Sequence, residues 1–414
     1  MHVSTAGDCR SRPPLLGTAN LMTMAFHGID LKPLANELIE RATTNGADAN
    51  ALMDLATVLL LCGLKRLSED VQAQALCLER EYLLESTHPA KVRLLAIMVP
   101  GDLMANAPLP FLLEKSDIAL TMLFIDIDED LPQDLPEHDV VFIAVSQSDR
   151  TEGLLQRLDR TFSRWERPVI NRPRRITATD RSSAFQVLDG APGITMPPTR
   201  RTTKEKLTAM TLAAENCPLV EGLPLPLIIR PVDSHAGVGL AKLTTHAELQ
   251  RYLEDQSAGS FFISPFVDYR SADGLFRKYR IVLVDGKALP AHMGISSDWM
   301  IHYLNSGMTE SPAKREEECA FMSTFTSAFK ARHETALAAI AMRFGLDYLV
   351  LDCAETPEGQ LLIFEVDPGS VVHSMDPDDL FPYKRPNMAK VYDAFRDMLL
   401  DRQSPKAVAA EPVV

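Results

Sequence analysis

The sequence predicts a mixed protein of α/β and α+β units, with a small all-helical unit near its N-terminal end. Three observations support this fold class. Before residue 88, apolar residues recur at the spacing of one helix face, whereas from residue 92 short apolar runs alternate with helical segments. In the last third of the chain, two apolar strands flank a turn of Pro and Gly, and both strands carry carboxylates.

The composition excludes several classes of protein. The chain has 414 residues and a formal net charge of −14, from 42 basic and 56 acidic residues. This balance disfavours nucleic-acid and anionic-membrane surfaces, which require positive charge. The six cysteines have no Cys-x-x-Cys spacing, and no apolar run approaches the ~20 residues of a membrane span. Because residues 1–20 show no export signal, we expect a cytoplasmic protein with reduced thiols.

The first unit is expected to span residues 1–88. Residues 1–25 have no clear pattern and are expected to form a loose lead. Leu31, Leu34 and Leu38 then predict a helix that ends near Asn45, and two further helices follow, to about residue 84. These helices resemble one tetratricopeptide-like unit, but no second copy occurs at the ~34-residue period of such arrays. We therefore expect a flexible lead and a small helical cap.

The second unit, residues 89–171, has the pattern of a parallel α/β sheet. Val92–Val99 is a continuous apolar run, as expected of a strand that is buried on both faces. Strands and helices alternate after it, which is typical of parallel sheets. The further strands are expected at Ile118–Ile127, Val140–Val145 and Pro168–Asn171.

The third unit is expected to span residues 172–402, in two lobes of about 172–265 and 266–402. A tail without pattern follows at 403–414. A long helix is predicted at Arg332–Phe344 and ends at Gly345. The strands of this unit are expected at Leu225–Val232, Ser260–Val267, Lys278–Val284, Tyr348–Cys353 and Leu361–Val366.

Three carboxylates, Asp352, Glu365 and Asp367, are predicted to share one face of a hairpin. With a two-residue turn at 358–359, Asp352 lies directly opposite Glu365. Asp367 shares the face of Glu365 because side chains alternate along a strand. A loop of three or five residues would instead split the three acids. Converging carboxylates require a cation, and hard oxygen ligands suit Mg²⁺, with Mn²⁺ as an alternative. In the competing interpretation, Asp352 and Asp367 only end strands in solvent.

A strand that carries Arg230 leads into a loop of small residues with Gly237 and Gly239. The backbone N–H groups of such a loop can bind phosphate, and Arg230 can neutralise it. The chain has no Walker A sequence, and the third glycine of a dinucleotide fingerprint is missing. Glycine-rich hairpin loops occur more often without a ligand, so the loop alone does not assign a function.

The order of these motifs is similar to that of the ATP-grasp superfamily, which includes D-alanine:D-alanine ligase, glutathione synthetase and the ribosomal-protein glutamate ligases. The resemblance runs from about residue 89 to 400. It comprises an α/β unit, Arg181, the Arg230 strand with its Gly loop, an apolar strand, the Arg280 strand and the carboxylates. It implies an ATP-grasp fold that follows a parallel α/β pre-grasp domain, with the helical cap outside it. It also implies that the protein uses ATP and Mg²⁺, and it makes a homodimer plausible.

The resemblance implies a role for each matching residue. Asp352, Glu365 and Asp367 would bind Mg²⁺, although the superfamily usually has Asn at the last position. Arg181 and Arg230 would hold the ATP phosphates, where the superfamily more often has lysines. The residues that would contact the nucleotide from the loop and along the hinge are Ser234, His235, Gly237, Gly239, Pro265, Phe266 and Val267.

A polar and aromatic run between the hinge and the carboxylates predicts the substrate side. In the chemistry of the superfamily, ATP phosphorylates a carboxylate and an amine attacks the acyl phosphate. Arg280 is the candidate for stabilising the oxyanions of both steps. His292 and His302 are candidates for positioning substrate or moving a proton, with a hydrogen-bonded structural role as the alternative. His373 is a further candidate for the acceptor pocket, and Trp299 belongs to the same run, with core packing as the alternative.

Three functions stay open at this point. The first is an ATP- and Mg-dependent ligase that activates a carboxylate as an acyl phosphate for attack by an amine or similar nucleophile. An ATP-grasp phosphotransferase would use the same nucleotide site and give a stable phosphorylated product. A non-catalytic ATP-binding sensor or scaffold would bind a protein partner through the helical cap. The expected partners of the ligase are small carboxylates and amines, with neither nucleic acid nor membrane.

Overall fold

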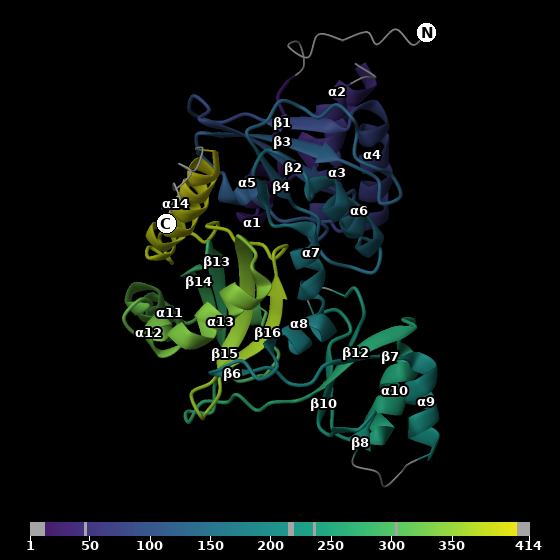
Figure 1. The fold of residues 1–414 in the computed structure, drawn as a ribbon, viewed down its shortest axis with the longest axis vertical. Helices are drawn as coiled ribbons and strands as arrows, with labels where there is room; N and C mark the ends of the chain where they lie inside the picture. The colour runs from purple at the N-terminus through teal and green to yellow at the C-terminus, as the bar shows by residue number, and fades with distance from the viewer. Residues whose placement is uncertain (1–12, 45–47, 214–218, 235–236, 303–304, 404–414) are drawn as a thin grey trace, which may run out of the picture.

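The structure is a computed structural model, and it describes residues 13–44, 48–213, 219–234, 237–302 and 305–403 (Figure 1). A helical unit and a first sheet form the N-terminal half of the chain, drawn in purple and blue at the top of Figure 1. Two further sheets form the other half, in teal and green. The predicted class of mixed α/β and α+β structure with an N-terminal helical unit is therefore confirmed.

Four helices form the N-terminal unit. They are α1 (Thr18–Phe26), α2 (Lys32–Thr44), α3 (Ala49–Leu61) and α4 (Lys65–Leu78). The expectation of a loose lead is wrong for α1, in which Leu21 packs fully buried against the other helices. Helix α1 is apolar on two faces, so its sequence lacks the single apolar stripe by which amphipathic helices are recognised.

The first sheet has five strands in the order β1-β3-β2-β4-β5. Strand β1 is antiparallel to β3, and the other pairs are parallel, as the strand and helix alternation predicts. Strand β1 lies in a segment that was expected to be helical; its Tyr82 is buried under the sheet. The bounds are β1 (Glu81–Leu84), β2 (Val92–Met98), β3 (Ile118–Phe124), β4 (Val140–Ile143) and β5 (Val169–Ile170), with α5 (Leu109–Leu112) and α6 (Glu152–Phe162).

The second sheet is antiparallel, in the order β11-β10-β12-β7, and two helices pack their apolar faces on it. These elements are β7 (Arg200–Thr203), α9 (Lys204–Ala213), β10 (Leu227–Pro231), β11 (Ala241–Leu243), α10 (His246–Asp255) and β12 (Ser260–Pro265). Beside them, β8 (Leu219–Val220) and β9 (Leu223–Pro224) form a separate two-stranded ladder.

The third sheet has the order β14-β13-β15-β16-β6. Its strands are β6 (Ile194–Thr195), β13 (Phe276–Val284), β14 (Lys287–Ser296), β15 (Tyr348–Glu355) and β16 (Leu361–Asp367). The helices of this part are α7 (Pro173–Ile176), η2 (Thr177–Thr179), α8 (Arg181–Leu188), α11 (Pro312–Thr324), α12 (Phe329–Arg332) and α13 (Glu334–Phe344). Helix α13 ends at Gly345, which has a φ of 60°, as predicted.

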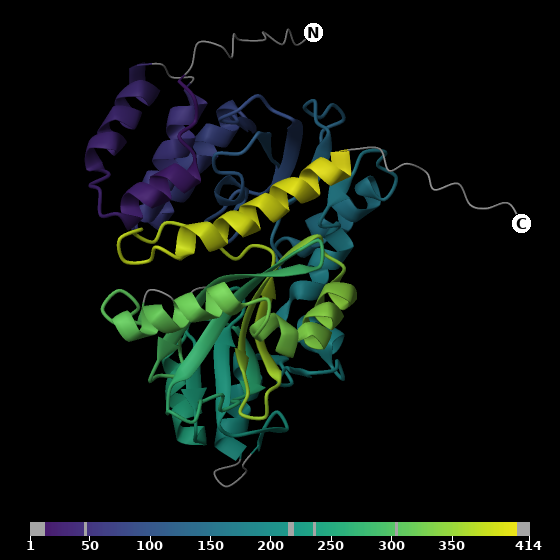
Figure 2. The same cartoon turned by 90° about the vertical axis from the view of Figure 1, so that its left-hand side faces the viewer.

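The last helix, α14 (Lys384–Gln403), runs between the first and third sheets (Figure 2). Its Phe395 ring lies 5.9 Å from the ring of Phe142 in β4 and 5.4 Å from that of Tyr348 in β15. One apolar core therefore joins the two parts of the chain. In the described ranges, no helix is long and apolar enough to cross a membrane.

Candidate functional site

A row of polar side chains crosses the third sheet. His292 of β14 pairs with Arg280 of β13, Arg280 pairs with Asp352 of β15, and Asp352 pairs with Glu365 of β16. Directly opposed residues share a face of the sheet, and their Cβ atoms lie ~5 Å apart. The strand register therefore places an imidazole, a guanidinium and two carboxylates in one line.

The hairpin of β15 and β16 reaches this register in an unexpected way. Its loop spans five residues, 356–360, and the pairing beside the loop joins Glu355 to Leu361. A bulge at Phe364 then shifts the register by one residue and brings Asp352 opposite Glu365. The predicted pairing is confirmed, but the predicted two-residue turn is wrong.

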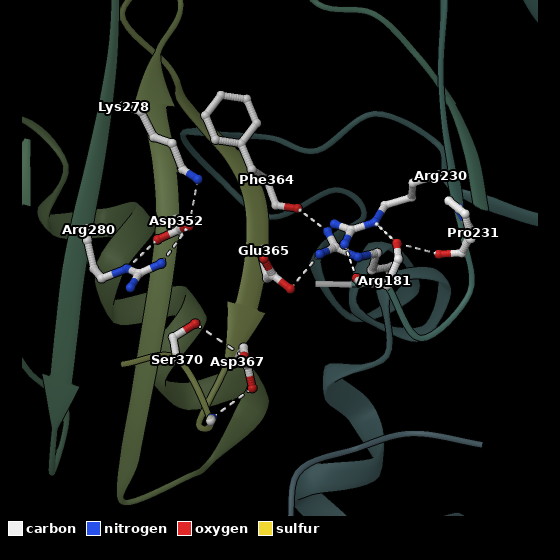
Figure 3. Close-up of polar contacts among 12 residues, drawn as sticks. Arg181, Arg230, Pro231, Lys278, Arg280, Asp352, Phe364, Glu365, Asp367 and Ser370 are labelled. Atoms are coloured by element: carbon white, nitrogen blue, oxygen red, sulfur yellow. Dashed lines mark hydrogen bonds and ion pairs between the residues drawn. The ribbon is translucent and has the colours of Figure 1, made fainter. Parts of the chain in front are cut away.

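Asp352 is the centre of the charged cluster (Figure 3). It is 4% exposed, and it accepts hydrogen bonds from Arg280 Nε at 2.7 Å and Nη2 at 2.9 Å. Lys278 Nζ lies 2.7 Å from Asp352 Oδ2, the oxygen that also accepts from Arg280 Nη2. Burial alone would raise the pKa of Asp352, but the two cations outweigh burial and hold that pKa well below its usual range. Asp352 is therefore ionised at neutral pH.

Glu365 and Asp367 point to different partners. Glu365 pairs with Arg181 at the start of α8, and Arg181 and Arg230 lower its pKa against the effect of burial. Asp367 instead accepts hydrogen bonds from the Gly369 N–H at 2.7 Å and the Ser370 hydroxyl at 3.2 Å. Burial and the charge of Glu365 raise the pKa of Asp367 to about 6.

The three carboxylates consequently do not converge on one point. In the part of the chain that the structure describes, no group of three or more His, Cys, Asp and Glu side chains is arranged to hold a metal. Two of the predicted ligands, Asp352 and Glu365, share a cavity wall, and Asp367 lies beyond it in its own turn.

Arg230 reaches the cluster from β10 in the second sheet. Its Nε donates to the Ser234 hydroxyl at 3.2 Å, and its Nη2 donates to the Ser234 carbonyl. Among the described residues it pairs with no carboxylate. Burial, together with the neighbouring charge of Arg181, lowers its pKa to about 10. Arg230 is thus a half-buried cation that has no carboxylate partner within the described residues.

The loop after Arg230 approaches the third sheet closely. Gly237 and Gly239 have φ values of 74° and 68°, which favour glycine. A Cβ on Gly237 would overlap the His302 ring, so the loop rests directly on that side chain. Burial and Lys278 lower the pKa of His302. His235, a predicted contact, lies outside the described residues.

These groups line one large cavity of about 450 Å³ between the second and third sheets. The charged part of its lining has four cations, Arg181, Arg230, Lys278 and Arg280, and two carboxylates, Asp352 and Glu365. The cations therefore exceed the carboxylates by two. The aromatic part of the lining packs as one cluster that contains Phe266, Val267, Tyr269, Trp299 and Phe364.

The predicted hinge residues contribute to the aromatic part of the lining. The ring centroids of Phe266 and Trp299 lie 5.8 Å apart. Lys242 Nζ lies over the Phe266 ring, 3.9 Å from its centroid. The Phe266 N–H is already bonded to the Pro226 carbonyl at 2.8 Å. Of the predicted residues that the structure describes, Ser234, Gly239, Asp367 and His373 do not line the large cavity.

Sequence reasoning missed Lys278 as a site residue. Its signal was present, because Lys278 lies two residues before Arg280 on a predicted strand and so shares its face. Ser370 and Val371 also line the cavity, and they follow β16 without regular structure, so no periodicity marks them.

A smaller cavity of about 60 Å³ adjoins Arg181, Glu365 and Asp367. Its far wall is the segment 146–149 that follows β4 of the first sheet. Ser146 is 7% exposed, and within the described ranges neither its hydroxyl nor the Gln147 side-chain oxygen has a hydrogen-bond partner. Buried polar groups of this kind are costly unless something pairs with them.

Comparison with known proteins gives structural likeness only. No protein-family model matches the chain, and neither does any curated protein. The VanG D-Ala:D-Ser ligase from Enterococcus faecalis matches with 14% identity and a TM-score of 0.47, over 75% of this chain and 99% of that one. The D-alanine–D-alanine ligase from Bacillus anthracis complexed with ATP matches with 15% identity and a TM-score of 0.42, over 75% and 98%.

A RimK domain ATP-grasp protein from Sphaerobacter thermophilus matches with 16% identity and a TM-score of 0.42, over 74% of this chain and 99% of that one.

Proposed function

We propose that this protein is an ATP- and Mg-dependent ligase of the ATP-grasp type, which activates a carboxylate for attack by an amine. The observation that carries the proposal is the lining of the large cavity, which combines an excess of two positive charges with a separate cluster of packed aromatic rings. A nucleoside triphosphate has the complementary chemistry, with a flat base at one end and a polyanion at the other.

Asp352 and Glu365 would hold the metal. Both face the cavity from adjacent strands, and the cations beside them keep both ionised, which is the state that a ligand of a hard divalent cation requires. Bound there, Mg²⁺ would neutralise charge on the phosphate oxygens. We assign the metal to these two residues and leave Asp367 out, because Asp367 does not line the large cavity.

Arg181 and Arg230 would bind the phosphates. Arg230 suits this role because it has no carboxylate partner among the described residues, so that an incoming anion would relieve its charge rather than displace an ion pair. Gly237 lines the same cavity, and the base would lie against the packed rings of Phe266 and Trp299.

The carboxylate substrate would bind beside Arg280, near His292 and Ser370. A substrate oxygen attacks the γ-phosphorus, the bond to the β-phosphate oxygen breaks, and ADP leaves. The lone pair of the amine then attacks the acyl carbon, phosphate departs, and the nitrogen loses a proton. Arg280 would stabilise the oxyanions. Burial and Arg280 hold the pKa of His292 well below its usual range, so we assign it to orientation rather than to proton transfer.

The amine would enter through the smaller cavity. The Ser146 hydroxyl and the Gln147 oxygen, both without a partner in the described part of the chain, would accept its N–H groups. The cavity adjoins Glu365, and therefore the proposed site of phosphate transfer.

The test combines nucleotide binding with turnover. We expect the wild-type protein to bind Mg·AMPPNP in calorimetry and to release ADP and phosphate from ATP when a panel of amino acids and small carboxylates is added. Glu365→Gln should lose at least ~100-fold of this turnover, in line with the loss of a group that stabilises transition-state charge. Glu355→Gln is the matched control, because Glu355 lies on the same hairpin but pairs with Arg332 and His333 outside the cavity.

Turnover by Glu365→Gln at the wild-type rate would contradict the metal assignment, and failure of the wild type to bind Mg·AMPPNP would contradict the nucleotide site. A stable phosphorylated product in place of free phosphate would instead indicate a phosphotransferase.

A further inference from the structure

Helix α1 packs on two different parts of the molecule. Leu21, Met24 and Ala25 face the core of the helical unit. Ala19, Met22 and Phe26, spaced to form a second stripe, pack with Phe111 of α5 and with Val371 and Met375 of the segment that follows β16. The helix therefore bridges the N-terminal helices and the segment 369–376.

Two specific contacts at the end of α1 hold this segment. His27 Nε2 donates to the Met375 carbonyl at 3.0 Å, in the tautomer that carries the proton there. The Phe26 ring lies 5.8 Å from the His373 ring, at 55°. Residues 371–375 have no helical or strand hydrogen bonds, so their position depends on contacts such as these.

The same segment forms part of the large cavity. Ser370 and Val371 line it, and the Val371 carbonyl accepts a hydrogen bond from Arg280 Nη1 at 2.8 Å. Arg280 uses Nε and Nη2 to bind Asp352. A chain of direct contacts thus leads from α1 through the segment to the guanidinium in the middle of the polar row.

We propose that α1 and His27 are a positioning element of the cavity, which holds segment 369–376 against Arg280 and so sets the shape of the substrate end. The helical unit would then be part of the site, although it lies outside the ATP-grasp core. The inference deepens the proposed function, on which the assignment of a substrate end and a nucleotide end rests. The nucleotide end is lined by other elements, such as Phe266 and Trp299, and should not depend on α1.

The test follows amide hydrogen exchange in segment 369–376 by mass spectrometry, on the full chain. His27→Ala should speed exchange there about two- to tenfold, the range that corresponds to the net value of one hydrogen bond. His27→Gln, which keeps a side-chain donor, should restore slow exchange. His88→Ala is the matched control, because His88 is exposed and lies far from the segment in the chain.

Nucleotide binding gives the second readout. The affinity for Mg·AMPPNP should change less than twofold in all three variants, whereas the KM of any carboxylate that stimulates phosphate release should rise in His27→Ala. Unchanged exchange in His27→Ala, or equal acceleration in His27→Gln, would overturn the proposal. If exchange responds as expected but the wild type does not bind Mg·AMPPNP, the nucleotide function fails while the link from α1 to the segment stands.

Discussion

Replacing Asp352 by Asn should destabilise the protein strongly, because the change leaves two buried cations without their counter-charge. Asp352 is 4% exposed and lies 2.7 Å from both Lys278 and Arg280. Removal of one partner from a buried ion pair costs about 3–5 kcal/mol, since the remaining charge stays desolvated. The side chains of Lys278 and Arg280 are 21% and 19% exposed, so water reaches them partly, and we expect the lower end, about 3 kcal/mol.

The assay is urea unfolding at pH 7, followed by circular dichroism. The midpoint should fall while the slope stays constant, because the surface exposed on unfolding is unchanged. Sodium triphosphate should stabilise Asp352→Asn more than the wild type, because an anion that binds the freed cations favours the folded state by mass action. Asp273→Asn is the control, since Asp273 pairs with Arg277 in a more exposed ion pair, and its loss should be far smaller.

A loss below about 1 kcal/mol in Asp352→Asn would refute this reasoning, since it would place the pair in the range of exposed ion pairs. Equal stabilisation of the variant and the wild type by triphosphate would refute the expectation that Lys278 and Arg280, once freed from Asp352, bind an anion.

Three further predictions concern other parts of the molecule. Burial raises the pKa of Asp54 from 3.8 to about 6, so the native state binds this proton more tightly than the unfolded state does. The free energy of unfolding should therefore fall by up to about 3 kcal/mol as the pH rises from 3.8 to above 6. Asp54→Asn should flatten the profile of unfolding free energy against pH. Gly239→Ala should lower the free energy of unfolding by at least about 1–2 kcal/mol, because its φ is 68° and a Cβ would lie 2.7 Å from the Pro231 ring. Gly359→Ala is the control, because Gly359 has a φ of 80° but no atom would lie within 4 Å of its Cβ. The same urea titration of this variant measures the backbone cost alone. Phe395→Ala should cost about 3–5 kcal/mol and lower one common calorimetric transition, whereas two separate transitions would contradict a shared core.

Local patterns predicted five strands of the site correctly but did not mark β14, which carries His292. Alternating and continuous apolar runs marked β10, β12, β13, β15 and β16, because a strand that is buried on one or both faces must show its burial in the sequence. The same alternation placed Glu365 and Asp367 on one side of β16. It could not show where their carboxyl groups point, and only one of the two faces the large cavity.

The hairpin shows how a correct pairing can rest on a wrong turn. A five-residue loop alone would have moved Asp352 away from Glu365, and the bulge at Phe364 compensates for it. A bulge depends on how the strand packs on both sides, and in this case the Phe364 ring lies 5.0 Å from the ring of Tyr269, 95 residues earlier in the chain by number. Sequence spacing does not carry this information.

The sequence alone determined strands β10, β12, β13, β15 and β16 and which residue types they bring to the centre of the third sheet, because these properties depend on neighbours two to four positions apart. The tertiary structure decided which charges pair and which side chains share a cavity. Arg280 lies 72 residues before Asp352, and Arg181 lies 184 residues before Glu365. It also decided that α1 and α14 join parts of the chain that local patterns had separated, because buried apolar surfaces select their partners by shape and position rather than by distance along the chain.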